Sequence, residues 1–191
     1  KKAYEIAKKR YAKYGIDTNE ILEKLNDKPI SLHCWQADDV GGFEEPDAEL
    51  EGGGIQATGN YPGKARSIAE LRQDIEKVME LLPGRQKLNL HASYGDFTGD
   101  KKVDRDEITI ENFQGWIDWA KEQGIGIDFN CTCFSHPKAA SGFTISSKND
   151  EIREFWIEHI KRCRKISAEI GKQLGIPCIH NLWIPDGSKD T

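Results

Sequence analysis

The sequence lacks the features that mark membrane proteins and nucleic-acid-binding proteins. No apolar run in its 191 residues approaches the roughly 18 residues that a membrane span requires. The net charge of -5 is spread along the chain, without the basic stripe that binds nucleic acid. Low-complexity tracts are also missing, and the apolar content is ordinary. We therefore expect one soluble globular domain that binds neither membranes nor nucleic acids.

The cysteines do not form the even-numbered framework of a disulfide-rich secreted protein. The chain has five of them, mostly within apolar runs: Cys34, Cys131, Cys133, Cys163 and Cys178. This usage is typical of reduced, buried thiols and predicts a cytoplasmic protein. The sequence also lacks an initiator Met, and Lys1 opens a charged amphipathic helix rather than a signal peptide. We expect that the start has been trimmed.

What is present is an alternation of helical and strand-like patterns. Residues 1–28 predict a helical extension of two short helices, the first ending at Gly15 and the second capped by Thr18. Residues 29–191 then predict four βα units. The expected strands cover residues 30–36, 88–92, 125–130 and 178–184. Ser67 and Glu70 form a predicted capping box at the start of the helix between the first two strands.

Four parallel strands are too few to close on themselves. A complete (β/α)₈ barrel needs about 250 residues, and an incomplete one leaves unpaired strand edges. Two interpretations therefore stand at this point: an open parallel α/β sheet, or half of a larger TIM barrel.

Every expected strand carries a polar face. Because side chains alternate along a strand, residues two apart share a face. The polar faces hold His33 and Trp35, Asn89 and His91, Asp128 and Asn130, and Asn181 and Trp183. Any one of these residues alone is more often a core group whose hydrogen bonds are satisfied within the fold. Because all four strands carry such a polar face, the pattern favours a polar cavity at the carboxyl ends of the strands. No phosphate-binding glycine motif follows a strand, so the pattern favours a sugar or polyol.

Four longer motifs carry a resemblance to a known family. They are SLHCWQADDV at 31–40, GGIQATGNYPGKAR at 53–66, CFSHP at 133–137 and NLWIPDGSKD at 181–190. Through them the sequence resembles the bacterial L-rhamnose isomerases along its whole length. The resemblance implies a (β/α)₈ barrel related to xylose isomerase, a divalent-metal site preferring manganese, and a homotetramer. It also implies the reversible conversion of the aldose L-rhamnose to the ketose L-rhamnulose.

The resemblance further implies which residues meet the sugar. Trp35, His91, Phe134 and Trp183 match sugar-contacting positions, with Phe134 against the methyl end of the sugar. The family's catalytic and metal-binding Glu, Asp and His residues belong to later strands, so we expect them on a C-terminal half that this sequence lacks. We then expect the isolated chain to be inactive. Possible supporting residues are His33, Asn89, Asp128, Asn130, Asn181 and Asp186.

Two loops have alternative interpretations. The glycines between Gly52 and Lys64 allow close approach to a ligand or a hinged lid, but they also suit a plain surface loop. Asp186 follows a strand end and would orient a site group, although Pro-Asp-Gly is also ordinary turn chemistry.

Two apparent metal motifs are weak. Residues 96–107 resemble a calcium loop, but Lys101 occupies the position that requires Gly. Cys131, Cys133 and His136 lack a fourth zinc ligand at a normal spacing. The remaining alternatives to an isomerase half are another metal-dependent sugar isomerase or epimerase, and a non-catalytic sugar-binding or interaction module.

Overall fold

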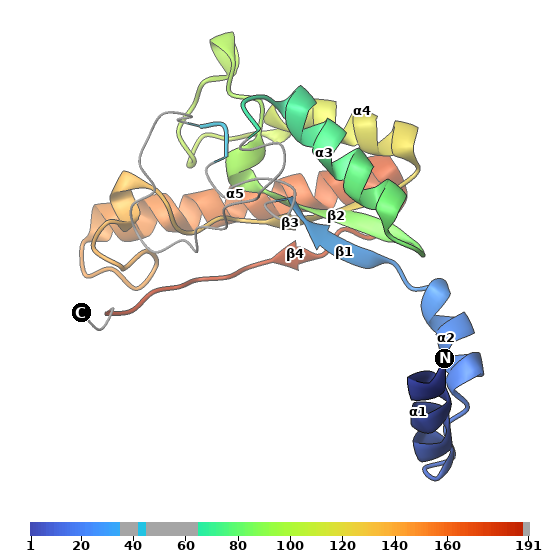
Figure 1. Ribbon diagram of the computed structural model, residues 1–191. Helices are drawn as coiled ribbons and strands as arrows, with labels where there is room; N and C mark the ends of the chain where they lie inside the picture. Colours follow the sequence, from blue (N-terminus) through green and yellow to red (C-terminus); the bar gives the residue numbers. More distant parts are fainter. Residues whose placement is uncertain (35–41, 45–64, 189–191) are drawn as a thin grey trace.

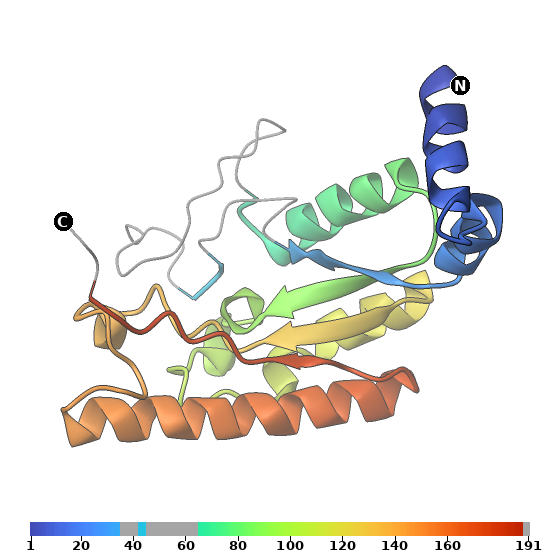
Figure 2. The same ribbon diagram turned by 90° about the horizontal axis from the view of Figure 1, so that it is seen from below.

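The computed structural model describes residues 1–34, 42–44 and 65–188. Four strands form one sheet: β1 (Ile30–His33), β2 (Gln86–His91), β3 (Gly126–Asn130) and β4 (His180–Asn181). They pair in the order β1-β2-β3-β4, and every pair is parallel. Figure 2 shows the four strands side by side with their arrowheads at the same end. The predicted α/β class and its four parallel strands are confirmed.

Three helices pack on one side of this sheet: α3 (Ile68–Leu81), α4 (Gln114–Gln123) and α5 (Asp150–Leu174). Among the described residues no helix covers the other side (Figures 1 and 2). An open doubly wound sheet carries helices on both faces, whereas a barrel carries them only outside. The arrangement is therefore consistent with part of a TIM barrel.

The core lies between the sheet and these helices. Leu88, Leu90, Ile127 and Phe129 are fully buried on the helix-facing side of β2 and β3, and the ring of Phe129 meets Phe113 edge to face at 4.9 Å. This is the apolar face that the alternation predicts.

Local capping explains where the helices begin and end. Asn149 accepts hydrogen bonds from two backbone N–H groups at the start of α5, and left-handed Gly124 and Gly175 end α4 and α5. The capping box predicted at α3 is only half formed. Ser67 accepts the N–H of Glu70, but the Glu70 carboxylate binds the N–H and guanidinium of Arg66 instead of the N–H of Ser67.

The sequence placed some element boundaries wrongly. The predicted strand at 178–184 is regular only over His180–Asn181, because within the described ranges β4 pairs with β3 alone and the chain then leaves the sheet. The described part of the first strand ends at His33. The second N-terminal helix is capped by Asp17, which accepts N–H groups of the first turn, rather than by Thr18.

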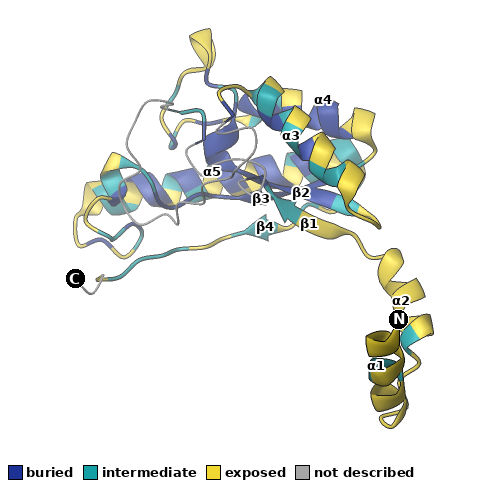
Figure 3. Cartoon of the chain, viewed as in Figure 1, coloured by how far each residue is buried: buried dark blue, intermediate teal, exposed yellow. Residues whose placement is uncertain are grey.

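The predicted helical extension consists of α1 (Lys2–Ala12) and α2 (Thr18–Asn26), and neither helix has a buried residue. Figure 3 shows both almost entirely exposed beyond the amino ends of the strands. The hydroxyl of Tyr4 binds Asn19 at 2.7 Å and joins the two helices. Of the helices in the described ranges, none combines the length and apolarity needed to cross a bilayer.

Candidate sugar-binding face

The side of the sheet away from the helices carries two layers of polar residues. The register pairs His33 with Asn89 and Asn89 with Asp128. One step further along, His91 pairs with Asn130 and Asn130 with Asn181. Register partners in a sheet point to the same side, so the polar faces predicted separately for each strand join into one surface.

A row of rings crosses this surface at the carboxyl ends of the strands. The ring centroids of His33 and His91 are 5.7 Å apart, those of His91 and Phe134 are 6.2 Å apart, and those of Phe134 and Trp183 are 5.2 Å apart. The structure thus brings together three of the four expected sugar contacts. The fourth, Trp35, lies outside the described residues, as does the stretch from Gly52 to Lys64.

The histidines in this row are uncharged at neutral pH. Burial, and then the unfavourable electrostatic interactions that a protonated His91 would have with His33 and Arg105, lower the pKa of His91 to about 3, and burial lowers the pKa of His33. Nδ1 of His91 lies 3.2 Å from the hydroxyl of Thr132. A neutral imidazole both donates and accepts hydrogen bonds, so the row offers polar contacts without charge and suits a neutral polyol better than an anion.

Asn89 has hydrogen-bonding capacity left over. Its Nδ2 lies 3.5 Å from Nε2 of His33, while its buried Oδ1 has no hydrogen-bond partner among the described residues. A buried carbonyl oxygen without a partner costs free energy. A hydroxyl group or a water molecule is the natural partner for this oxygen.

Asp128 and Asn130 have contacts within the fold. The buried carboxylate of Asp128 forms an ion pair with Lys87 and accepts the N–H of Ile179 at 2.8 Å, which ties β4 to the sheet. Oδ1 of Asn130 accepts the N–H of Thr132 at 2.8 Å, which fixes the turn after β3. Asn181 is half-buried beside Asn130.

Asp186 fastens the segment after β4 to the loop before α5. Its carboxylate accepts the hydroxyl of Thr144 at 2.5 Å and the hydroxyl of Ser146 at 2.6 Å. Burial alone would raise the pKa of Asp186, but the hydrogen bonds from Ser146 and Thr144 lower it on balance. Asp186 therefore keeps its charge and holds this loop, and its hydrogen-bond partners are loop residues rather than residues of the polar face.

Sequence reasoning missed Arg105, which is only 2% exposed. Its guanidinium binds both carboxylate oxygens of Glu44, at 2.8 and 2.6 Å. The same group donates to the carbonyl oxygens of Thr132, Phe134 and Ser135. No pattern in the sequence identifies it, since its partners lie in two distant loops and three of them are backbone atoms.

No group of three or more His, Cys, Asp or Glu side chains gathers within the described residues in a way that would hold a metal ion. In the calcium-like segment, Lys101 donates to Asp96 at 2.7 Å, so an ammonium group occupies one carboxylate. In the zinc-like motif, His136 binds Asp104 while Cys131 lies beside His180. These residues face different partners.

The five cysteines are free thiols, as expected. Burial raises the pKa of Cys178 to about 12, so this thiol is not nucleophilic at neutral pH. His159 is buried on α5, with its ring nitrogens 2.8 Å from the carbonyl oxygen of Arg105 and 2.5 Å from that of Cys131. His159 is therefore a satisfied, buried group of the helix-side packing.

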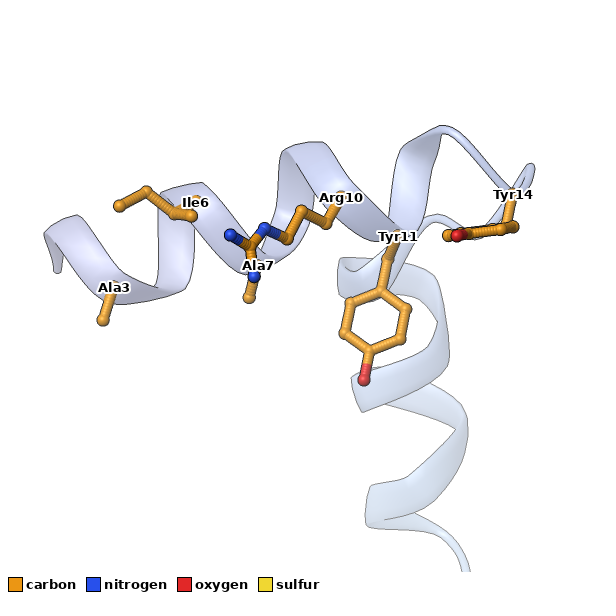
Figure 4. Close-up of a pocket in the computed structure, with 6 residues that line it drawn as sticks. All are labelled: Ala3, Ile6, Ala7, Arg10, Tyr11 and Tyr14. Carbon is orange, nitrogen blue, oxygen red and sulfur yellow. The ribbon is translucent and has the colours of Figure 1, made fainter.

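A hollow of about 350 Å³ lies elsewhere, along α1. It is lined by Ala3, Ile6, Ala7, Arg10, Tyr11 and Tyr14 (Figure 4). All six come from α1 and the turn after it, so no second element of the described chain lines the hollow, and it lies apart from the polar strand residues.

Comparisons with known proteins place the chain in one family. A family model described as L-rhamnose isomerase (RhaA) matches residues 1–191. The L-rhamnose isomerase of Escherichia coli O127:H6 (strain E2348/69 / EPEC) is 56% identical over 188 residues, which are 98% of this chain and 44% of that protein. Those of strains O1:K1 / APEC and O139:H28 (strain E24377A / ETEC) are 55% identical over the same shares. The chain thus spans less than half the length of the curated relatives that it matches.

Proposed function

Because the chain belongs to the L-rhamnose isomerase family, we propose that the protein containing it interconverts L-rhamnose and L-rhamnulose. This chain supplies the substrate-binding part of a (β/α)₈ barrel. The observation that carries the proposal is the row of rings formed by His33, His91, Phe134 and Trp183 on the polar face of the sheet.

In this proposal the residues of the row make two kinds of contact with the sugar. Neutral His91 and His33, with Asn89 beside them, exchange hydrogen bonds with sugar hydroxyl groups. Phe134 and Trp183 meet edge to face at 5.2 Å and form an apolar wall for the methyl end of the sugar. The family resemblance adds Trp35 as a further expected sugar contact. The wall also excludes water, which strengthens the polar contacts next to it.

Catalysis requires residues beyond the described part of this chain. As the family resemblance implies, we assign manganese and its ligands to the portion of the relatives that this chain does not span. Pairing of the sheet edges with that portion would cover Ile30 and Ile179, which are 62% and 65% exposed. We further propose a cytoplasmic homotetramer.

The test is to assay ketose formation from L-rhamnose by the full-length protein and by this chain alone, each with manganese. We expect activity in the full-length protein, none in the chain alone, and recovery when the chain is co-expressed with the remaining portion. Ketose from the chain alone would refute its role as a substrate-binding part. An inactive, folded full-length protein would refute the proposed reaction.

A further inference from the structure

We propose that the ion pair of Arg105 and Glu44 positions Phe134, and thereby sets the preference of the enzyme for a 6-deoxy sugar over its 6-hydroxy counterpart. This inference rests on the proposed function, in which Phe134 meets the methyl end of the sugar. Arg105 and Glu44 act as positioning residues, since neither is assigned a contact with the sugar.

Arg105 holds the loop that carries Phe134 through its backbone. Its Nη1 donates to the carbonyl oxygens of Thr132 and Phe134, the latter at 2.6 Å, and its Nη2 donates to that of Ser135 at 3.0 Å. Three carbonyl groups within four residues are therefore fixed by one side chain. The position of the Phe134 ring follows from the position of this backbone.

The loop has a conformation that requires such support. Thr132 and Ser135, on either side of Phe134, have φ angles of 55° and 51°. Residues with a Cβ atom rarely adopt this left-handed region, and they persist in it only where surrounding contacts impose it. The three hydrogen bonds from Arg105 are contacts of this kind, together with the hydrogen bond from Thr132 to Asn130.

Glu44 orients the guanidinium from the opposite side, on a segment docked against the turn after β2. The N–H of Phe43 donates to the carbonyl of Ser93 at 2.7 Å, and its ring meets Tyr94 edge to face at 5.3 Å. Gly42 has a φ of +68°, and a Cβ atom there would lie 2.5 Å from the same carbonyl oxygen. Glu44 therefore reaches Arg105 from the carboxyl end of β2, the strand that carries His91.

The requirement for arginine follows from its geometry. Its planar fork serves the two oxygens of Glu44 and the three carbonyl groups at once, whereas the single ammonium of lysine cannot reach them all. Glu44 also neutralises the charge of Arg105, which keeps the neighbouring polar face neutral for an uncharged sugar. The pair therefore links the β2 end of the site to the loop after β3.

The experiment uses the full-length protein and compares kcat and KM for L-rhamnose with those for L-mannose, which differs by a hydroxyl group at carbon 6. The variants are Phe134→Leu, Glu44→Gln, Arg105→Lys and the Glu44→Gln/Phe134→Leu double variant. Arg72→Lys is the matched control, because Arg72 packs over Trp116 at 4.9 Å on the helix side of the sheet.

We expect Phe134→Leu to reduce the preference for L-rhamnose about tenfold. Glu44→Gln and Arg105→Lys should each reduce it about three- to tenfold, mainly by raising KM for L-rhamnose. The double variant should lose no more preference than Phe134→Leu alone, because both changes act through the same ring. Arg72→Lys should keep the preference of the parent.

A changed preference in Phe134→Leu with an unchanged one in both Glu44→Gln and Arg105→Lys overturns the positioning role. An unchanged preference in Phe134→Leu instead overturns the assignment of Phe134 to the sugar, and the inference with it. If Arg105→Lys does not fold, the Glu44→Gln variant alone tests the positioning role, because it keeps the size of the side chain and one oxygen acceptor.

Discussion

The two faces of the sheet differ in the kind of residue that they carry. On the helix side, Leu88, Leu90, Ile127 and Phe129 are fully buried in a continuous apolar core. On the other side, the strands carry His33, Asn89, His91 and Asn130. Among the described residues, no helix covers this side. Because side chains alternate along a strand, substitutions on the two sides should have different consequences: for stability on the helix side and, under the proposed function, for sugar binding on the other side.

The largest effect on stability should come from the helix side. Phe129→Ala removes a fully buried ring that packs against Phe113. The cavity should lower the free energy of unfolding by about 3–5 kcal/mol. Urea unfolding of the full-length protein measures this loss. A loss below about 1 kcal/mol would show that the helix-facing core does not support the sheet.

A somewhat smaller loss should follow from breaking the buried ion pair of Lys87 and Asp128. Lys87→Met leaves the Asp128 carboxylate buried without its cation, which should cost about 3 kcal/mol. The matched control is the Lys87→Met/Asp128→Asn double variant, which keeps an oxygen acceptor for the N–H of Ile179 and should regain much of the lost stability because no charge is left unpaired. If the double variant is no more stable than Lys87→Met, charge burial is not the cause.

The face without helices should make the protein sensitive to acid. Since the pKa of His91 falls to about 3 in the folded state, the unfolded chain binds a proton that the folded chain does not bind between that pH and about 6.5. Stability is therefore full above pH 6.5 and decreases as the pH falls, by up to about 1.4 kcal/mol per pH unit from His91.

The four other histidines have pKa values lowered by burial and act in the same direction: His33, His136, His159 and His180. Urea midpoints from pH 7.5 to 4 test this dependence. His91→Gln should make it shallower. An equally steep dependence in that variant would remove His91 from the explanation.

The smallest effect on stability, combined with a clear effect on binding, should come from Trp183→Ala. Trp183 is 39% exposed, so its removal should change the free energy of unfolding by about 1 kcal/mol or less. Loss of the aromatic wall should nevertheless raise KM for L-rhamnose about tenfold. An unchanged KM would exclude Trp183 from the sugar site.

Much of the fold could be predicted because it depends on local patterns. The alternation in β2 and β3 correctly separated Leu90 and Phe129 from His91 and Asn130. Boundaries were less accurate where tertiary contacts decide them, as at β4, which has a strand partner on one side only among the described residues.

The site was predictable only in part. Phe134 entered through the family resemblance, because it lies in a loop without periodicity. Arg105 could not be found at all, since its contacts with the carbonyl groups of residues 132, 134 and 135 leave no signature in side-chain types. Asp128 has the residue type of a site group, but its observed partners, Lys87 and the N–H of Ile179, belong to the sheet itself.

The most direct test of the sugar-binding face is the steady-state kinetics of L-rhamnose isomerisation by the full-length His91→Phe variant. Phenylalanine keeps a ring in the row but removes both nitrogen atoms. Trp119→Phe is the control, since it removes the hydrogen bond from Trp119 to Glu76 and part of a buried ring, both on the helix side. The account predicts that kcat/KM falls by about 10- to 100-fold in His91→Phe and stays at the parent value in Trp119→Phe. Parent-level kcat/KM in His91→Phe, or an equal fall in both variants, would contradict it.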